Sequence, residues 1–211
     1  MTKILTAVVI AGAALAAAAT AAAPVTVSLA ASATVVDYGK PVTLSGTLST
    51  QKANQAIAVQ ATECGSTKVV KAATVKTTAN GAYTTPVTPT LGTSYQATFK
   101  NAKSNAAAVT VRPLLLLTRV ARGSFTAKVT AGQALTGKAV LFQRYAKARR
   151  RWVQVKRVVL GVAAPGPAKP AMVTSASFKA KVALRARVRL LISTAQAGPC
   201  YVTATSNVVR A

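Results

Sequence analysis

The side chains that most often carry out chemistry are scarce in this sequence. The chain has 211 residues and no histidine, and its only carboxylate side chains are those of Asp37 and Glu63. A histidine-activated nucleophile, a His-ligated zinc, a paired-carboxylate glycosidase and an acidic Ca²⁺ or Mg²⁺ cage are therefore not expected. The segment Ser49-Thr50-Gln51-Lys52 fits the S-x-x-K pattern of Ser-Lys acyl enzymes, but it lies between a predicted strand and a turn, without the helix that this chemistry needs. We predict a non-enzymatic protein with no cofactor and no bound metal.

Cationic side chains, in contrast, are abundant. The chain holds 27 Lys and Arg residues against two acidic ones, a formal net charge of +25 at neutral pH. Residues 24–112 carry eight basic and two acidic side chains, a net +6, whereas residues 113–211 carry 18 basic and none acidic, a net +18. Guanidinium groups form forked hydrogen bonds with phosphate and carboxylate. This asymmetry predicts that the second half of the chain binds polyanions.

The basic side chains of the second half form two groups. The first spans residues 144–157, with most of it on a predicted loop, and includes Tyr145 and Trp152, which are candidates for stacking on a sugar or a base; packing of Trp152 near Phe142 is the alternative. The second group alternates with apolar residues over 185–190, which predicts three guanidinium groups on one face of a strand. The candidate polyanion-binding residues are Arg144, Lys147, Arg149, Arg150, Arg151, Lys156, Arg157, Arg185, Arg187 and Arg189.

Several partners would suit such a surface. We expect an anionic polymer of the cell envelope or another polyanion: a cell-wall polymer, lipopolysaccharide, anionic lipid, polysaccharide or extracellular DNA. The sequence has no recognition-helix or RNA-binding motif, so sequence-specific binding of nucleic acid is not expected. In the alternative interpretation the charge only aids solubility, and the protein is a passive structural module or contacts another exported protein.

Short strands must position these residues. The chain is rich in Val and Thr, is punctuated by Gly, Pro and Asn, and lacks long helical periodicity, while Asn80-Gly81 is a hairpin signal. Six or seven short strands in about 90 residues favour a β-sandwich. The alternating segments of the first half are Val25–Leu29, Val42–Leu48, Ala56–Gln60, Tyr83–Val87, Tyr95–Phe99 and Ala108–Val111.

The second half repeats the first. Val42–Gln60 aligns without gaps on Phe125–Gln143, at an offset of 83 residues. Tyr95–Phe99 also matches Leu184–Val188, and Ser104-Asn105 matches Ser206-Asn207 before the last strand of each copy. The predicted boundary lies near Pro113, whose fixed φ suits a short, stiff junction. The second copy contains two insertions, at Gly161–Met172 and Ser193–Cys200.

The repeated segments resemble a known family. Gly39–Ser49, with Asn80–Tyr83 and Pro89–Tyr95 after it, is similar to bacterial immunoglobulin-like modules, and Lys138–Arg144 with Trp152–Val155 resembles the corresponding part of a second module. The resemblance implies an all-β fold of two tandem immunoglobulin-like or fibronectin-III-like β-sandwiches, residues 22–112 and 113–211. Such modules mostly serve as spacers, adhesive domains or structural repeats, so the resemblance implies a fold and no particular activity.

The two cysteines lie in different copies. Under that fold, Cys64 follows the third strand of the first module and Cys200 lies in the last connection of the second. In a head-to-tail tandem these two ends face each other, so we predict a disulfide bond between Cys64 and Cys200. Two unpaired thiols and pairing with another molecule are the alternatives that remain open.

The first 21 residues have the layout of a secretory signal peptide. Met1-Thr2-Lys3 is a cationic start, Ile4–Ala19 is an apolar run, and Ala19-Thr20-Ala21 offers a small-x-small cleavage site. No Cys stands directly after this run, so a lipoprotein is not expected. No second apolar run of spanning length occurs, so no transmembrane segment is expected after cleavage. We predict a secreted protein, extracellular or associated with the cell envelope.

Overall fold

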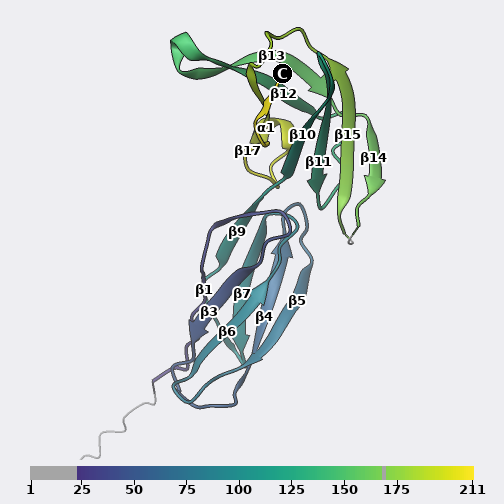
Figure 1. The fold of residues 1–211 in the computed structure, drawn as a ribbon. Helices are drawn as coiled ribbons and strands as arrows, with labels where there is room; N and C mark the ends of the chain where they lie inside the picture. The colour runs from purple at the N-terminus through teal and green to yellow at the C-terminus, as the bar shows by residue number, and fades with distance from the viewer. Residues whose placement is uncertain (1–22, 168–169) are drawn as a thin grey trace, which may run out of the picture.

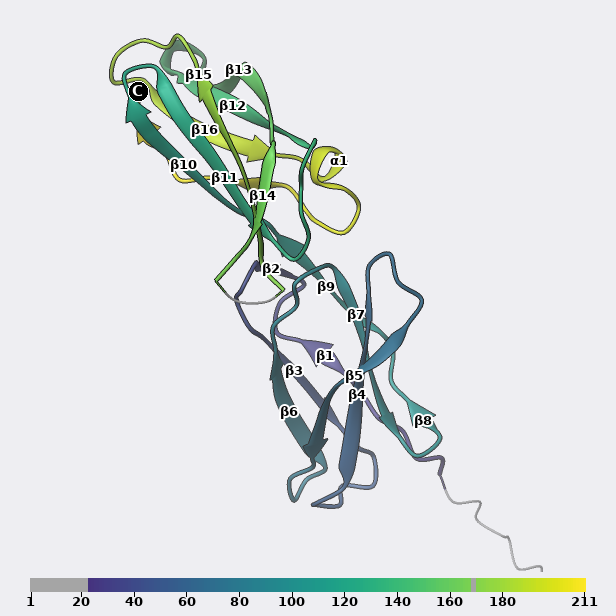
Figure 2. The same cartoon turned by 90° about the vertical axis from the view of Figure 1, so that its right-hand side faces the viewer.

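The structure, a computed structural model, describes residues 23–167 and 170–211. The predicted signal peptide, residues 1–21, lies outside the described residues. Within them, strands dominate and form four sheets, which confirms the all-β fold class. Figures 1 and 2 show two elongated lobes placed end to end, which we call the N-terminal lobe (residues 23–112) and the C-terminal lobe (residues 113–211). None of the described helices is both long enough and apolar enough to cross a membrane.

The N-terminal lobe packs one sheet on another. The first has the order β1-β3-β6, and the second has the order β2-β9-β7-β4-β5, with β8 also paired to β7. β7 illustrates the packing, because Thr93, Tyr95, Ala97 and Phe99 are buried while the residues between them are half-exposed. The strands are β1 (Ala30–Ala31), β2 (Val35–Asp37), β3 (Val42–Thr47), β4 (Ala56–Glu63), β5 (Val69–Lys76), β6 (Ala82–Val87), β7 (Thr93–Phe99), β8 (Ala102–Lys103) and β9 (Ala107–Arg112).

The C-terminal lobe has a related plan. One sheet has the order β10-β11-β15-β14, and the other has the order β13-β12-β16-β17, with β18 also paired to β16. Phe125, Phe142 and Phe178 pack between the sheets with ring centroids 5.0–5.7 Å apart. The elements are β10 (Leu114–Ala121), β11 (Ser124–Ala131), β12 (Ala139–Ala146), the 3₁₀ turn η1 (Lys147–Arg149), β13 (Arg151–Val159), β14 (Val162–Pro165), β15 (Met172–Lys179), β16 (Arg187–Ile192), α1 (Thr194–Ala197), β17 (Ala204–Thr205) and β18 (Val209–Arg210).

Both lobes thus have the layered strand order expected of sandwiches, and this order is compatible with immunoglobulin-like domains. One predicted strand is wrong: in Val25–Leu29 only Val27 makes a β-bridge, to Leu48, and the first named strand begins at Ala30. The edge strand β5 was missed by the sequence reasoning, because Val69–Lys76 is mostly exposed and its apolar residues do not alternate cleanly.

The internal repeat is visible in the strand positions, but one of its matches is wrong. At the offset of 83 residues, the start of β3 corresponds to the second residue of β11. The start of β4 corresponds to the start of β12. Ser104 Oγ accepts from the Ala97 N–H at 2.9 Å, and Ser206 Oγ accepts from the Leu190 N–H at 2.8 Å. Ala97 is therefore equivalent to Leu190 rather than to Ala186, so the match of Tyr95–Phe99 to Leu184–Val188 is displaced by four residues.

The lobes are bonded to each other at their junction. Cys64 and Cys200 form a disulfide with their Cα atoms 5.3 Å apart, which confirms the predicted pairing. The Cys64 N–H donates to the Gly92 carbonyl at 2.7 Å, and the Gly92 N–H donates to the Cys200 carbonyl at 2.9 Å. Tyr201 makes a parallel β-bridge with Val111, is 1% exposed, and accepts from the Gly132 N–H at 3.0 Å through its hydroxyl. The second insertion, Ser193–Cys200, therefore ends in the segment that joins the two lobes.

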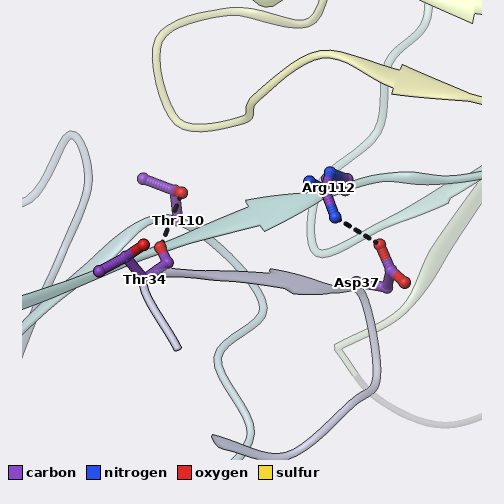
Figure 3. Close-up of polar contacts among 4 residues, drawn as sticks. All are labelled: Thr34, Asp37, Thr110 and Arg112. Atoms are coloured by element: carbon purple, nitrogen blue, oxygen red, sulfur yellow. Dashed lines mark hydrogen bonds and ion pairs between the residues drawn. The ribbon is translucent and has the colours of Figure 1, made fainter. Parts of the chain in front are cut away.

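An ion pair closes the edge of the N-terminal lobe beside this junction (Figure 3). β2 runs parallel to β9, where Thr110 Oγ1 donates to the Thr34 carbonyl at 3.0 Å and Arg112 lies 3.6 Å from the Asp37 carboxylate. Both charged side chains are about half exposed, so the pair contributes little to stability. Asp37 thus has a local structural role, as a charge partner within one strand pair.

Candidate functional site

The hairpin of β12 and β13 carries most of the candidate residues. The sequence reasoning assigned Arg144 to Trp152 to a loop, and that is wrong in part: the two strands extend to Ala146 and from Arg151, and η1 with Arg150 makes the turn between them. Arg150 adopts the left-handed conformation, with a φ of 47°, and its N–H donates to the Lys147 carbonyl at 3.1 Å. Figure 1 shows this hairpin projecting from the end of the C-terminal lobe that lies away from the N-terminal lobe.

In the sheet formed by β13, β12, β16 and β18, the alternation of buried and exposed residues along β16 shows which face points outward. Val188, Leu190 and Ile192 are fully buried, so Arg187 and Arg189 point away from the core. The register places Gln143 opposite Arg189, and therefore Tyr145 at the level of Arg187. Tyr145 in turn pairs with Trp152 on β13. Both aromatic residues therefore share the outer face with both arginines.

These four side chains form the arginine–aromatic cluster: Tyr145, Trp152, Arg187 and Arg189. The Arg189 guanidinium carbon lies 4.3 Å from the centroid of the Trp152 ring, and that of Arg187 lies 5.2 Å from the Tyr145 ring. The two rings meet edge to face, with centroids 5.4 Å apart. Gln143 completes the arrangement, because its Oε1 accepts from Arg189 Nε at 2.9 Å. Each cation–π contact is worth about 0.5–1 kcal/mol at an exposed site.

Arg189 is the most enclosed cation of the cluster. Partial burial lowers the pKa of its guanidinium from the ordinary value. Water therefore solvates this charge less completely than it does a free arginine, and an arriving anion has less water to displace. Trp152 is half-buried on the face opposite Phe142, so it packs against Arg189 and Tyr145 rather than within the core.

The second group of cations forms the hairpin tip: Arg144, Lys147, Arg149, Arg150 and Arg151. Arg144, Lys147 and Arg149 line a shallow hollow of about 380 Å³ together with Ala146, Ala148 and Val153. Arg144 pairs with Val153 just before the Tyr145–Trp152 pair, and the Ala146–Arg151 pair directly follows it, so the residues of the tip adjoin the cluster on both sides of this pair. The tip and the cluster are thus neighbouring parts of one projecting element.

The three remaining candidate cations lie in different places. Arg157 pairs with Leu141 and shares the outer face. Lys156 pairs with the buried Phe142 instead, and its Nζ donates to the Lys179 carbonyl of the opposite sheet at 2.9 Å. Arg185 is not on the strand: it precedes β16 in a turn with a φ of 60°, so the prediction of three arginines on one strand face is wrong for this residue.

Sequence reasoning missed one cation of this face. Arg210 on β18 lies directly opposite Arg187 and is exposed. Its neighbours in sequence contain no basic residue, so only the pairing of β18 with β16 reveals its place.

The Ser49–Lys52 segment, considered above for Ser-Lys chemistry, contains no helix. Ser49 Oγ accepts from the Thr26 N–H at 2.9 Å and lies in a turn after β3. Among residues 23–167 and 170–211, no three His, Cys, Asp or Glu side chains gather into a group that could hold a metal ion. No protein-family model matches the chain, and no curated protein matches it. The function is therefore inferred from the residues of the site.

Proposed function

We propose that this protein is an exported, non-enzymatic module of two tandem immunoglobulin-like domains that attaches to anionic polymers of the cell envelope through its C-terminal lobe. The disulfide bond and the strand order are compatible with an extracellular protein of this class. The signal-peptide pattern of residues 1–21 supports export.

The observation that carries this proposal is the arrangement of cations on the β12–β13 hairpin and the strand beside it. The tip and the cluster adjoin, and residues 113–211 contain no Asp or Glu to neutralise them. Uncompensated charges at this density attract polyanions and a counterion atmosphere. The hollow at the tip is shallow and the cluster lies on an open sheet face, so attachment is made by many weak, salt-sensitive contacts rather than in one deep pocket.

Retention of the purified protein on its own cell envelope tests the proposal. We expect retention to fall steeply as NaCl rises from about 0.05 M to about 0.5 M, because salt screens exposed charges. The variant Arg149→Ser/Arg150→Ser/Arg151→Ser should be released at lower salt. A matched control, Lys68→Ser/Lys71→Ser/Lys76→Ser, removes three exposed charges from the N-terminal lobe and should behave like the wild type. Equal losses in both variants would contradict a specific role of the C-terminal lobe.

A second candidate function is a passive structural or protein-partner module in which the charge aids solubility. Three exposed apolar side chains on the edge strand β10 favour it: Leu114, Leu116 and Val120 are 54%, 45% and 69% exposed. Such a module would keep its partner at about 0.5 M salt, where exposed charges act only over short distances. Salt-insensitive retention in the same experiment would therefore favour this second function.

A further inference from the structure

The cluster and Arg210 together present three guanidinium groups on one flat face. Arg187 and Arg189 are two residues apart on β16, which places their Cα atoms about 7 Å apart. Arg210 faces Arg187 across the β16–β18 pair, about 5 Å away at the backbone. Three cations this close repel one another unless anions lie between or above them. The face therefore fits a ligand that carries several negative charges at short intervals.

The hydrogen-bonding groups of this face are mainly donors. A guanidinium group has five N–H donors and no acceptor. The side-chain oxygen of Gln143 already accepts from Arg189 Nε, so the fork of Arg189 that suits a ligand is the pair of parallel N–H groups on its two Nη atoms. Two parallel N–H groups are the geometry that binds two oxygens of one oxyanion. The face is thus suited to a ligand whose charged groups only accept hydrogen bonds.

The aromatic rings are engaged by the arginines. Arg189 covers the Trp152 ring at 4.3 Å, Arg187 covers the Tyr145 ring at 5.2 Å, and the rings contact each other edge to face. The ring face that each guanidinium group covers is closed to stacking by a nucleobase or a sugar ring. The rings therefore support the arginines, and the ligands that fit this face best are polymers that need no ring stacking.

We propose that the arginine–aromatic cluster with Arg210 binds the phosphodiester groups of a polyol-phosphate polymer, with guanidinium forks holding successive phosphates. This inference rests on the proposed function and specifies its ligand. Phosphodiesters are charged acceptors that recur along a flexible chain, and a polyol backbone has no ring to stack. Tyr145 and Trp152 are positioning residues that hold Arg187 and Arg189 in place.

Binding of three polymers tests the ligand class. Poly(glycerol phosphate) supplies phosphodiesters without rings. Polygalacturonate supplies carboxylates on sugar rings, and oligo(dT) supplies phosphodiesters together with nucleobases. At equal charge concentration and fixed salt, the wild type should bind poly(glycerol phosphate) most tightly by calorimetry. Binding of either other polymer with equal or higher affinity would overturn the assignment.

Two charge-matched variants test the site. Arg187→Gln/Arg189→Gln should weaken binding of poly(glycerol phosphate) at least about tenfold, because forked hydrogen bonds to charged groups are lost. The control Arg119→Gln/Arg122→Gln removes two exposed charges outside this face of the C-terminal lobe and should weaken it less than about threefold, as expected for exposed charges. Equal effects would show that net charge alone acts and would overturn the proposal. A different result would reject the proposed function itself: retention of the wild type on its cell envelope that does not change with salt.

A double-mutant cycle tests the positioning role of Trp152. Trp152→Leu keeps every charge and should weaken binding when Arg189 is present, but should have no further effect in the Arg189→Gln background. Circular dichroism checks that each variant is folded. An effect of Trp152→Leu that is the same in both backgrounds would contradict the positioning role.

Discussion

The disulfide bond should account for a large part of the stability of this protein, because it closes a very long loop. Cys64 and Cys200 are 136 residues apart in the sequence. On the chain-entropy model, a loop of this length lowers the entropy of the unfolded chain enough to stabilise the fold by about 5 kcal/mol. The variant Cys64→Ala/Cys200→Ala should lose about this free energy of unfolding.

Urea unfolding measures this loss with two signals. Trp152 is the only tryptophan in the sequence, so its fluorescence reports on the C-terminal lobe, while far-UV circular dichroism reports on both lobes. In the wild type the two transitions should coincide, because the junction is bonded by backbone hydrogen bonds and a buried tyrosine as well as the disulfide. Reduced wild type is the control and should match the variant. A loss below about 2 kcal/mol, with both proteins unfolding in one transition, would refute the entropic reasoning.

Three further results are expected. Gly46→Ala should destabilise the N-terminal lobe by about 1–3 kcal/mol, because a Cβ there would overlap the Ser28 carbonyl and the Tyr83 ring. Gly161→Ala should be nearly neutral in the same urea experiment, because the nearest atom to its Cβ would be the Ser175 carbonyl oxygen at 4.0 Å, an ordinary contact. Asn207→Ala should lower the free energy of unfolding by about 1–3 kcal/mol, because the Asn207 amide forms hydrogen bonds with both the N–H and the carbonyl of Leu117. Asn105→Ala, at the equivalent position of the N-terminal lobe, should lower it less. Equal losses would contradict this role of Asn207. The free energy of unfolding should fall as pH rises from about 10 to about 12, because burial raises the pKa of Tyr83 and of Tyr201 to about 12, so these tyrosines ionise at lower pH in the unfolded chain than in the folded one. Tyr83→Phe should make this fall less steep. A pH-independent unfolding midpoint over that range would contradict the prediction.

Much of the fold could be predicted from the sequence because its signals are local. Alternating burial along β7 and the hairpin at Asn80-Gly81 need only neighbouring residues to be recognised. The disulfide was also predictable once two modules were assumed, because a tandem places Cys64 and Cys200 at facing ends.

The errors arise where alternation is not enough. The pattern of arginine and apolar residues continues back to Arg185, but a left-handed turn there starts the strand two residues later. The same ambiguity displaced the match to Tyr95–Phe99 by four residues, since any alternating segment fits another. Ser104 and Ser206, each bonded to the backbone of the strand before it, give the correct register.

The cluster itself could not be read from the sequence. Gln143 and Arg189 are 46 residues apart, and their contact depends on the register between β12 and β16. A single sequence shows that Tyr145, Trp152 and the arginines exist, but not that they share one face. Arg210 is hidden for the same reason, because its place depends on the pairing of the short strand β18.

The salt dependence of attachment tests the central claim most directly. We would measure retention on the cell envelope against salt concentration for the wild type and for a variant that replaces Arg149, Arg150, Arg151, Arg187 and Arg189 with glutamine. Attachment through these cations predicts a steep wild-type dependence on a log–log plot, with a slope that falls by about one unit for each arginine that contacts an anion. A wild-type dependence that is flat, or a variant slope equal to that of the wild type, would contradict the account.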